Sequence, residues 1–357
     1  MKVHNHYKKV ISVTTIQYST YMKYIVQYVV TVLFLYSCTQ KEQANIIIEN
    51  NPIIPEIFDT GITDMLTAEN MAVCDSFLLV TNQMEKPFFH VYNRSDYSLV
   101  GTFGFQGQGP GDFGYPFFLC TDRNSKGLIQ IYDVNLAAFK QIDIKKTLEK
   151  DPQAIISSPM PPQIIGSPDL IQYKDFYIGN LDFNNRLFFI YHAPTKQLKW
   201  VEFPSSLEIP IEEDCFSGQN RITINFQSQR IVSAMHYYNK VFLYDTQGTY
   251  LKEVQVGEEE IRPQLDSRNW ITKESKVFCM RIQSTNRNIY MLVHNMKQGD
   301  ERPSSSRIIV LDWELHYLKT YQMPYPIIDI LIDEQQNRII YKTINEEGDM
   351  SIHYFNE

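Results

Sequence analysis

The 357-residue sequence has few of the residues that mark common catalytic and metal-binding sites. It contains five cysteines, and no two lie close enough for a C-x-x-C zinc or redox motif. The zinc motif H-E-x-x-H and the serine-hydrolase motif G-x-S-x-G do not occur. No glycine-rich stretch is followed by the Lys-Ser/Thr pair of a phosphate-binding loop. The sequence therefore lacks the marks of the best-defined zinc, hydrolase and nucleotide-binding classes.

Positive charge is scarce as well. Lysine and arginine together number 33 against 41 acidic residues, which gives a net charge of −8 at pH 7. A nucleic-acid partner requires a basic surface that neutralises phosphates, and docking on anionic lipids by charge requires the same. The composition therefore argues against both partners.

The apolar run near the N-terminus is too short to span a bilayer. It follows Met22-Lys23, covers residues 24–34 and leads into Leu35-Tyr36-Ser37-Cys38. This arrangement resembles a bacterial lipoprotein signal, in which a small residue precedes a cysteine that is lipidated after cleavage. Tyr36 departs from the small or branched residue usual at its place. We predict a lipoprotein signal peptide over residues 1–38, with lipidated Cys38 and a true start at Met22; a buried strand ending in a free cysteine is the alternative.

Processing before Cys38 would leave 29 basic and 41 acidic residues, a net charge of −12. Membrane attachment would then depend only on the lipid, and residues 39–44 would form a short linker. Thr39-Gln40 lacks the aspartate associated with inner-membrane retention in some bacteria. We therefore expect a protein anchored at the outer membrane, either periplasmic or surface-exposed.

The composition beyond this segment favours strands. Tyrosine (23) and phenylalanine (21) are abundant, and the 15 glycines and 17 prolines fall mostly between apolar runs. Only residues 144–150 and 258–269 have a pattern compatible with short helices. The sequence therefore predicts an all-β fold.

A repeat is visible in this all-β part. Residues 241–256 form an apolar strand, a polar turn at Gly248 and a second strand, which together predict a hairpin. Similar segments recur, and each has a polar residue at the end of its first strand. These six polar anchors are 44 to 67 residues apart: Asn93, Asp143, His192, Asp245, Asp312 and Asn356. Several strands in a period near fifty residues indicate a β-propeller with six blades.

The last repeat lacks its outermost strand, because only Glu357 follows Asn356. We therefore predict a six-bladed β-propeller of four-stranded blades over residues 45–357, with its ring closed by an N-terminal strand. Either residues 45–49 or the adjoining residues 53–58 would supply that strand and remove the free sheet edges. Two stacked β-sandwiches are the alternative architecture.

One repeat carries a more specific pattern. Its sequence contains Gly101-x-x-Gly104-x-x-Gly107-x-Gly109-Pro110-Gly111-Asp112-Phe113-x-x-Pro116, and the strand 128–133 follows. This segment resembles an NHL-type propeller repeat. The whole chain resembles the TolB-like or NHL-like propeller lipoproteins of Bacteroides-type bacteria. The resemblance implies binding of proteins, peptides or glycans, although some relatives are metal-dependent hydrolases or lyases.

The glycine-rich stretch is expected to link the outer strand 99–103 of one blade to the inner strand 117–120 of the next. In a propeller such links share a face with the turns between the two middle strands of each blade. We therefore predict that Gln106, Gln108, Asp112, Tyr115 and Asn135 lie on one face and contact a ligand. The alternative is a purely structural connection, in which the glycines permit positive φ and close packing of loops.

The remaining chemical candidates are weaker. Four histidines lie in predicted strands of different blades: His90, His192, His294 and His353. They could hold a metal ion on the axis, but no two of them share a short spacing, and the alternative is that they are ordinary strand residues. The segment 212–214 (Glu-Glu-Asp) reads as a solvated acidic loop, with calcium binding as the alternative. The segment 236–238 (His-Tyr-Tyr) predicts a packed turn, or a platform that stacks a sugar or peptide. Export would permit disulfides, and the spacing assigns none among Cys74, Cys120, Cys215 and Cys279.

Taken together, these features predict an exported, lipid-anchored, monomeric propeller that acts as a non-catalytic binding module. Its partner would be an envelope protein, peptide or glycan. No catalytic residue and no cofactor are predicted. The competing hypothesis is a metal-dependent hydrolase or lyase with calcium or zinc in the propeller channel, and a third is a scaffold in an envelope complex.

Overall fold

A computed structural model describes residues 45–63, 68–82, 86–122, 127–181, 186–207, 209, 216–345 and 348–357. The described residues all belong to one compact unit, Asn45–Glu357. The predicted signal peptide, Cys38 and the linker 39–44 lie outside the described residues, as do Cys215 and the acidic segment 212–214. Within the described part, no helix has both the length and the apolar character needed to cross a membrane.

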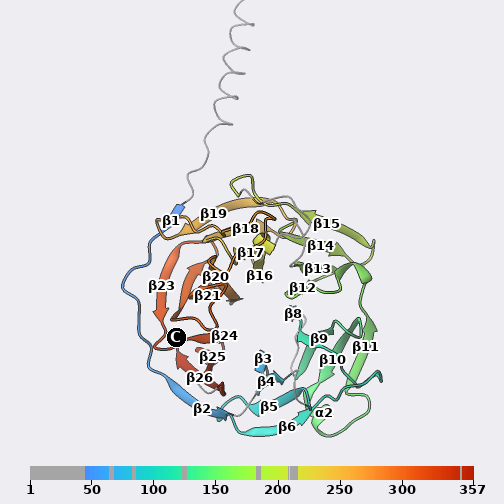
Figure 1. Cartoon of the computed structure of the whole chain (residues 1–357). Helices are drawn as coiled ribbons and strands as arrows, with labels where there is room; N and C mark the ends of the chain where they lie inside the picture. The colour runs from blue at the N-terminus through green and yellow to red at the C-terminus, as the bar shows by residue number, and fades with distance from the viewer. Residues whose placement is uncertain are drawn as a thin grey trace, which may run out of the picture. The chain divides into compact units, whose positions relative to one another are not determined.

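Residues 45–357 form six mainly antiparallel sheets arranged in a ring (Figure 1). We number them as blades 1 to 6 and give their strands from the centre outward. Blade 1 contains β3 (Ala68–Cys74), β4 (Phe77–Asn82), β5 (Phe89–Asn93) and β6 (Leu99–Phe103). Blade 2 contains β7 (Pro116–Phe118), β9 (Leu128–Asp133), β10 (Ala138–Asp143) and β11 (Ile155–Pro159). Blade 3 contains β12 (Leu170–Tyr173), β13 (Phe176–Gly179), β14 (Phe188–His192) and β15 (Gln197–Val201).

The second half of the ring repeats this order. Blade 4 contains β16 (Asn220–Asn225), β17 (Arg230–Met235), β18 (Lys240–Asp245) and β19 (Tyr250–Val256). Blade 5 contains β20 (Lys276–Ser284), β21 (Asn288–Lys297), β22 (Ser306–Asp312) and β23 (Tyr317–Gln322). Blade 6 contains β24 (Ile327–Asp333), β25 (Arg338–Ile344), β26 (Met350–Asn356) and β2 (Phe58–Thr63). The prediction of six four-stranded blades is confirmed, and two blades have a fifth strand: β8 (Cys120–Thr121) pairs with β12, and β1 (Asn45–Ile47) pairs with β19.

The polar anchors that revealed the repeat all end the third strand of a blade. Their side chains organise the turn that follows. The Asp245 carboxylate accepts the backbone N–H groups of residues 247 and 249, at 2.9 and 2.8 Å. Asp312 accepts those of residues 314 and 316 in the same way. Short polar side chains favour such turns because they replace a backbone acceptor, and this explains why the period was visible in the sequence.

An N-terminal strand closes the ring, as predicted, but the segment differs from both expected ones. The closing strand is β2, at residues 58–63, which pairs with β26. Residues 45–47 add to blade 4 as β1, and Ile53 forms a bridge with Tyr321 of blade 5. The apolar run at 45–48 suggested a buried strand, yet Ile46 and Ile48 are about half exposed (53% and 51%). Residues 45–63 therefore form a strap along the outer edges of blades 4, 5 and 6 (Figure 1).

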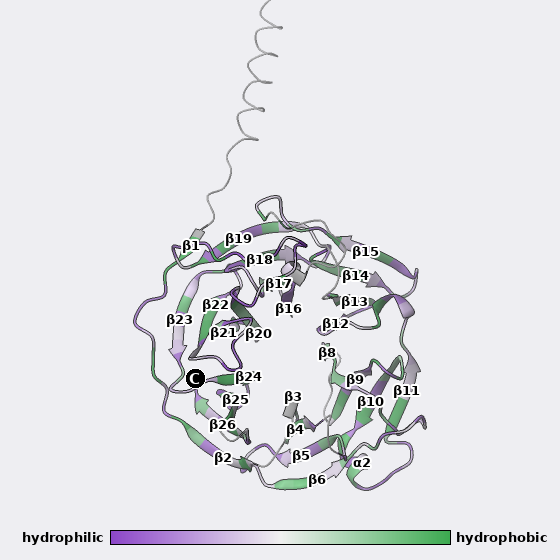
Figure 2. Ribbon diagram, viewed as in Figure 1, coloured by the Kyte–Doolittle hydropathy of each residue, from purple (hydrophilic) through white to green (hydrophobic). Residues whose placement is uncertain are grey.

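The core lies between neighbouring sheets, and hydrophobic residues occur in all six of them (Figure 2). At the seam between blades 1 and 6, Leu78 and Val80 of β4 pack in one cluster with Ile340 of β25 and Ile62 of β2. The strand that closes the ring is thus also part of its hydrophobic core.

The two helix predictions had different outcomes. The helix α2 (Ile144–Leu148) forms, and the Asp143 carboxylate caps it by accepting the N–H of Lys146 at 3.1 Å. No helix forms over residues 258–269, which make an irregular loop that begins at Gly257, with φ of 87°. Pro263 lacks the backbone N–H that a helix interior needs, and the Asp266 carboxylate instead accepts the N–H groups of a tight turn.

Candidate functional site

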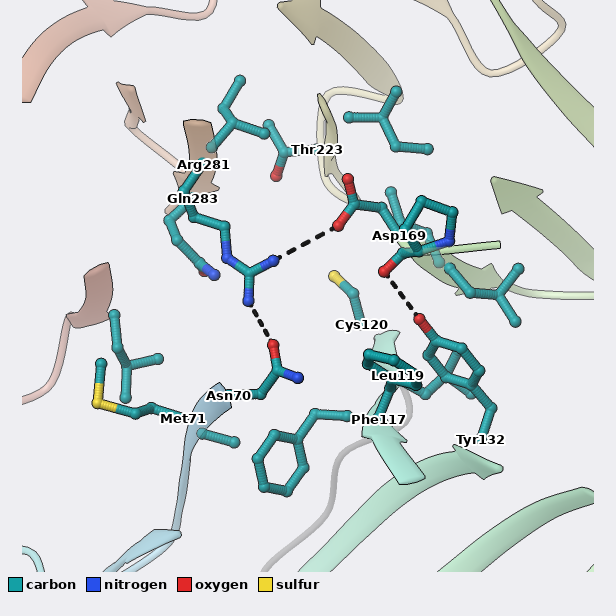
Figure 3. Close-up of a pocket in the computed structure, with 18 of the residues that line it drawn as sticks. Asn70, Met71, Phe117, Leu119, Cys120, Tyr132, Asp169, Thr223, Arg281 and Gln283 are labelled. Carbon is teal, nitrogen blue, oxygen red and sulfur yellow. Dashed lines mark hydrogen bonds and ion pairs between the residues drawn. The ribbon is translucent and has the colours of Figure 1, made fainter. Parts of the chain in front are cut away.

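Two adjoining cavities lie among the inner strands. Their volumes are about 230 and 640 Å³, and they share five lining residues: Asn70, Phe117, Pro168, Asp169 and Arg281. Figure 3 shows the smaller cavity. Because the lining residues come from all six blades, the cavities occupy the centre of the ring.

A group of charged and polar side chains, which we name the channel cluster, lines these cavities. Its residues are Asn70 of β3, Asp169 just before β12, Arg221 of β16, Arg281 of β20, Asp329 of β24 and Lys342 of β25. Blade 2 supplies Phe117 of β7 beside them. Each inner strand directs one side of its pleat toward the axis, so side chains far apart in the sequence meet there.

Arg281 is the centre of the channel cluster. Its Nε donates a hydrogen bond to Asp329 Oδ1 at 2.9 Å, and its Nη2 donates to Asn70 Oδ1. Its Nη1 lies 3.7 Å from Asp169 Oδ1. The Asp329 carboxylate is the main cause of a raised Arg281 pKa, and Asp169 adds to it. Arg281 therefore holds a permanent positive charge at the cavity wall, where a quarter of its side chain (25%) remains exposed.

Asp169 faces two guanidinium groups without a close contact to either. Its Oδ2 lies 3.8 Å from Arg221 Nη1, and this oxygen accepts no hydrogen bond from the described residues. The chain around it is held in place, because the Tyr132 hydroxyl donates to the carbonyl of Pro168 at 3.0 Å. Figure 3 shows Asp169 and Arg281 pointing toward each other across the cavity.

Lys342 is the third basic side chain of the channel cluster. Lys342 is almost fully buried (2% exposed), and its Nζ lies 3.5 Å from Asp329 Oδ2. Three cations, Arg221, Arg281 and Lys342, thus stand against two carboxylates among the residues that line the cavities.

The thiol of Cys120 points toward the space between Arg281 and Asp169 (Figure 3). Desolvation by the surrounding walls raises its pKa to about 12, and the nearby charges of Asp169 and Asp122 add to the effect. The side chain is therefore an uncharged thiol at neutral pH, whereas a nucleophilic cysteine requires the thiolate.

The five predicted ligand residues lie on the loops where the sequence placed them. Gln106, Gln108, Asp112 and Tyr115 lie between β6 and β7, and Asn135 lies in the turn between β9 and β10. The two loops touch, because the N–H groups of Gly114 and Tyr115 donate to the Asp133 carboxylate at 2.7 and 3.0 Å. None of the five residues lines either central cavity. Their contact with a ligand stays a prediction.

Internal contacts hold the glycine-rich loop together. The Asp112 carboxylate accepts the Gly109 N–H at 2.8 Å, and the buried Lys140 amine donates to the carbonyls of Pro110 and Asp112 at 3.0 and 2.6 Å. Gly104 has a φ of 86°, and a Cβ there would lie 2.7 Å from the Phe89 ring. These contacts give the conspicuous residues of the loop a structural role.

The strand histidines do not converge on the axis. They lie on second or third strands of their blades rather than on inner ones: His90 on β5, His192 on β14, His294 on β21 and His353 on β26. Among the described residues, no group of three or more His, Cys, Asp or Glu side chains could hold a metal ion.

The predicted His-Tyr-Tyr segment is buried, whereas Cys120, one of the candidate cysteines, is exposed. Tyr237 and Tyr238 are each about 3% exposed, so they form a packed turn and present no open stacking platform. Cys74, Cys120 and Cys279, the cysteines that the structure describes, are free thiols.

The channel cluster was not found from the sequence, although a signal for it exists. Arg221, Arg281 and Asp329 are charged residues beside apolar neighbours in their strands, and each of these strands is the first of its blade in the sequence. A propeller places its first strands around the axis. A comparison of the charged residues in the first strand of each blade would have indicated the site.

Comparison with known proteins supports the fold. A family model described as TolB-like 6-blade propeller-like matches residues 65–335. A Bacteroides vulgatus protein of the DUF4221 family has a similar structure, with a TM-score of 0.60, 10% identity and coverage of 88% of this chain and 98% of that one. A Bacteroides fragilis protein named as a candidate exported protein matches with a TM-score of 0.52 and 13% identity, over 87% of this chain and 98% of that one. No curated protein matches the sequence.

The solved structures share too little sequence identity to indicate more than a common fold. The family model covers most of the chain, from the first blade to the end of the inner strand of blade 6. The chain belongs to the TolB-like six-bladed propeller family.

Proposed function

We propose that this propeller is a non-catalytic binding module that takes part of a protein, peptide or glycan of the bacterial envelope into its central cavities. One observation supports the proposal: five blades contribute polar or charged side chains to the central cavities, and blade 2 contributes Phe117. A cavity with a few convergent polar groups and apolar walls is the usual form of a ligand site.

The chemistry of the cavity favours binding over catalysis. Cys120 is the side chain most like a nucleophile there, and its raised pKa keeps it a thiol. Asp169 and Asp329 lie beside guanidinium or ammonium groups in ion-pair contacts.

We further propose that the protein is exported and anchored at the outer membrane through a lipid on Cys38, and that it acts as a monomer. The N-terminal sequence supports export and lipidation. The similar Bacteroides fragilis protein is named as a candidate exported protein. Ring closure by β2 supports a monomer, since β26 has its partner within the same chain.

The test is to fill the cavity. Gln283 lines it, and Gln283→Trp would occupy part of its volume. Gln197→Trp is the matched control, because Gln197 is exposed on the outer strand of blade 3. Envelope peptides, glycans and proteins would be screened against the purified protein by calorimetry. We expect a ligand that binds the wild type and the control but not Gln283→Trp.

Two outcomes would contradict the proposal. One is equal binding by Gln283→Trp and the wild type, which would place the ligand elsewhere. The other is a stoichiometric metal ion in the purified protein together with turnover of a substrate, which would favour the hydrolase or lyase hypothesis.

A further inference from the structure

The strap, residues 45–63, presents apolar side chains to solvent along the outer edge of the ring (Figure 1). Four of its isoleucines are exposed, and we name them the rim patch: Ile46 (53%), Ile48 (51%), Ile53 (45%) and Ile54 (74%). The adjoining outer strands β19 and β23 expose three more large apolar side chains: Tyr250, Leu251 and Leu318. Seven of the 13 large apolar side chains that are exposed among the described residues thus lie on or beside the outer edges of blades 4 and 5. Such a concentration indicates an interaction surface.

The strap turns its charge inward and its isoleucines outward. Glu49 is the only charged residue in positions 46–54. Its carboxylate accepts hydrogen bonds from Arg307 Nε and from the Thr320 hydroxyl of blade 5, both at 3.0 Å. Ile47 also points inward and packs in the core cluster of blades 4 and 5. This pattern is the reverse of that expected for a sheet edge that faces water, where charged side chains are usually the exposed ones.

Hydrogen bonds fix the strap in this orientation. The strand β1 pairs with β19. The Ile53 N–H donates to the Thr320 carbonyl at 2.8 Å, and the Ile53 carbonyl accepts the N–H of Gln322 at 2.9 Å. The Tyr317 hydroxyl donates to the Asn50 carbonyl at 3.1 Å. The exposed isoleucines therefore cannot turn into the ring without the loss of these contacts.

The position of the strap in the chain indicates what covers the rim patch. Asn45 lies seven positions after Cys38, the residue proposed above to carry the lipid. A chain of this length spans at most about 25 Å, so the lipid would hold the start of the strap within that distance of the bilayer. A surface held this close acts at a high effective concentration, and weak contacts with it then suffice. The bilayer is therefore the nearest apolar environment for the rim patch.

We propose that the rim patch docks on the surface of the phospholipid bilayer that holds the Cys38 lipid. This inference rests on the lipid anchor of the proposed function and adds an orientation to it. The isoleucine side chains would leave water for the boundary of the acyl chains, so the contact depends on apolar burial and requires no anionic lipid. The rim patch lies at the outer edge of the ring, whereas the central cavities lie at its axis. Docking by the rim would therefore leave both mouths of the channel open to solution.

The test uses the full lipidated protein in phosphatidylcholine vesicles with plain or brominated acyl chains, which quench tryptophan on contact. Ile54→Trp places a probe in the rim patch. Ile156→Trp is the matched control, because Ile156 is also highly exposed (63%) but lies on β11, the outer strand of blade 2. The three native tryptophans are present in both variants and cancel in the comparison. We expect brominated lipid to quench the added tryptophan of Ile54→Trp at least about threefold more than that of Ile156→Trp, at low and at high salt.

A second pair of variants tests the contact itself. Ile46→Gln with Ile48→Gln, made in the Ile54→Trp protein, should reduce the quenching by at least about twofold, because less apolar surface is buried. Co-sedimentation with vesicles should stay unchanged, since the lipid still holds the protein. Leu99→Gln with Val100→Gln is the matched control, because these residues are similarly exposed on the outer strand of blade 1. It should leave the quenching unchanged.

Three results would overturn the inference. Equal quenching of Ile54→Trp and Ile156→Trp in vesicle-bound protein would refute the docking and leave the lipid anchor standing. Quenching that disappears at high salt would show attraction by charge instead of apolar contact. Absence of a lipid on Cys38 by mass spectrometry, together with failure of the protein to sediment with vesicles, would refute the anchor and the docking together. Ligand binding in the central cavities is tested separately by Gln283→Trp.

Discussion

The seam between blades 1 and 6 contains a buried ion pair whose removal should destabilise the whole ring. Arg94, in the turn after β5, donates from Nε to Asp333 Oδ2 at 2.6 Å and from Nη2 to Asp333 Oδ1. Its Nη1 also donates to the Asp75 carbonyl at 2.9 Å. The side chains are 6% and 0% exposed, so neither charge has water as a substitute partner.

Arg94→Met would leave the Asp333 carboxylate buried with one remaining donor, the N–H of Gln336 at 3.0 Å. Removing one partner of a buried pair costs about 3–5 kcal/mol, because the other charge is left uncompensated. We expect Arg94→Met to lower the free energy of unfolding by about this amount, and Arg94→Met combined with Asp333→Asn to recover part of it. The measurement is urea unfolding followed by tryptophan fluorescence.

The matched control is Arg262→Met, because Arg262 pairs with Glu260 at 3.0 Å but has a side chain 55% exposed. Exposed pairs contribute about 0–1 kcal/mol, so this substitution should change stability little. The reasoning would be refuted if Arg94→Met stayed within about 1 kcal/mol of the wild type, or if both substitutions had the same effect.

Two further predictions concern the strap and a buried histidine. A chain that begins at residue 55 keeps β2 and should remain monomeric and folded. A chain that begins at residue 64 leaves β26 without its outer partner and should aggregate. Size-exclusion chromatography distinguishes the two outcomes, and a monomeric chain that begins at residue 64 would contradict the role of β2. His236 is buried, and desolvation lowers its pKa from 6.5 to about 4, while Arg221 and His294 add to the effect and a bond to the Cys279 carbonyl opposes it. Below pH 6.5 the His236 side chain takes up a proton in the unfolded chain but not in the folded chain. The contribution of neutral His236 to the free energy of unfolding is therefore fully present above pH 6.5 and decreases as the pH falls toward 4. Between pH 7 and pH 5 we expect this group to lower the free energy of unfolding by roughly 2 kcal/mol. His236→Gln should remove that part of the pH dependence in urea unfolding, and an unchanged dependence would contradict it.

Most of the fold could be predicted because its repeat depends on local chemistry. Each third strand ends in a polar residue, and residues such as Asp245 and Asp312 satisfy backbone donors two to four positions further on. Such a requirement leaves a mark at a fixed position in every repeat. The closing strand was harder to identify, since Phe58–Thr63 has alternating exposure and contains Gly61, whereas the more apolar run at 45–48 became an exposed outer strand.

The candidate site could not be predicted in the same way, because no short segment contains it. Asn70 and Arg281 are 211 positions apart and are joined by a hydrogen bond only because the ring brings blades 1 and 5 to one axis. The glycine-rich loop shows the reverse case. Its residues are conspicuous because the backbone needs them at Gly104 and Asp112, and neither residue lines the central cavities.

This contrast has a physical basis that bears on how the site works. Blade packing depends on the apolar residues between neighbouring sheets, whereas the channel cluster occupies the axis, where each inner strand contributes a side chain largely independent of that packing. A substitution at the axis can therefore alter the charge of the cavity with little change to the blades, provided that no buried charge is left unpaired. Asp169→Asn breaks no direct hydrogen bond to either arginine, because the contacts of Asp169 with Arg221 and Arg281 are 3.8 and 3.7 Å long. It removes one negative charge from the cavity without removing a short contact, and so it tests the chemistry of the site apart from the stability of the fold.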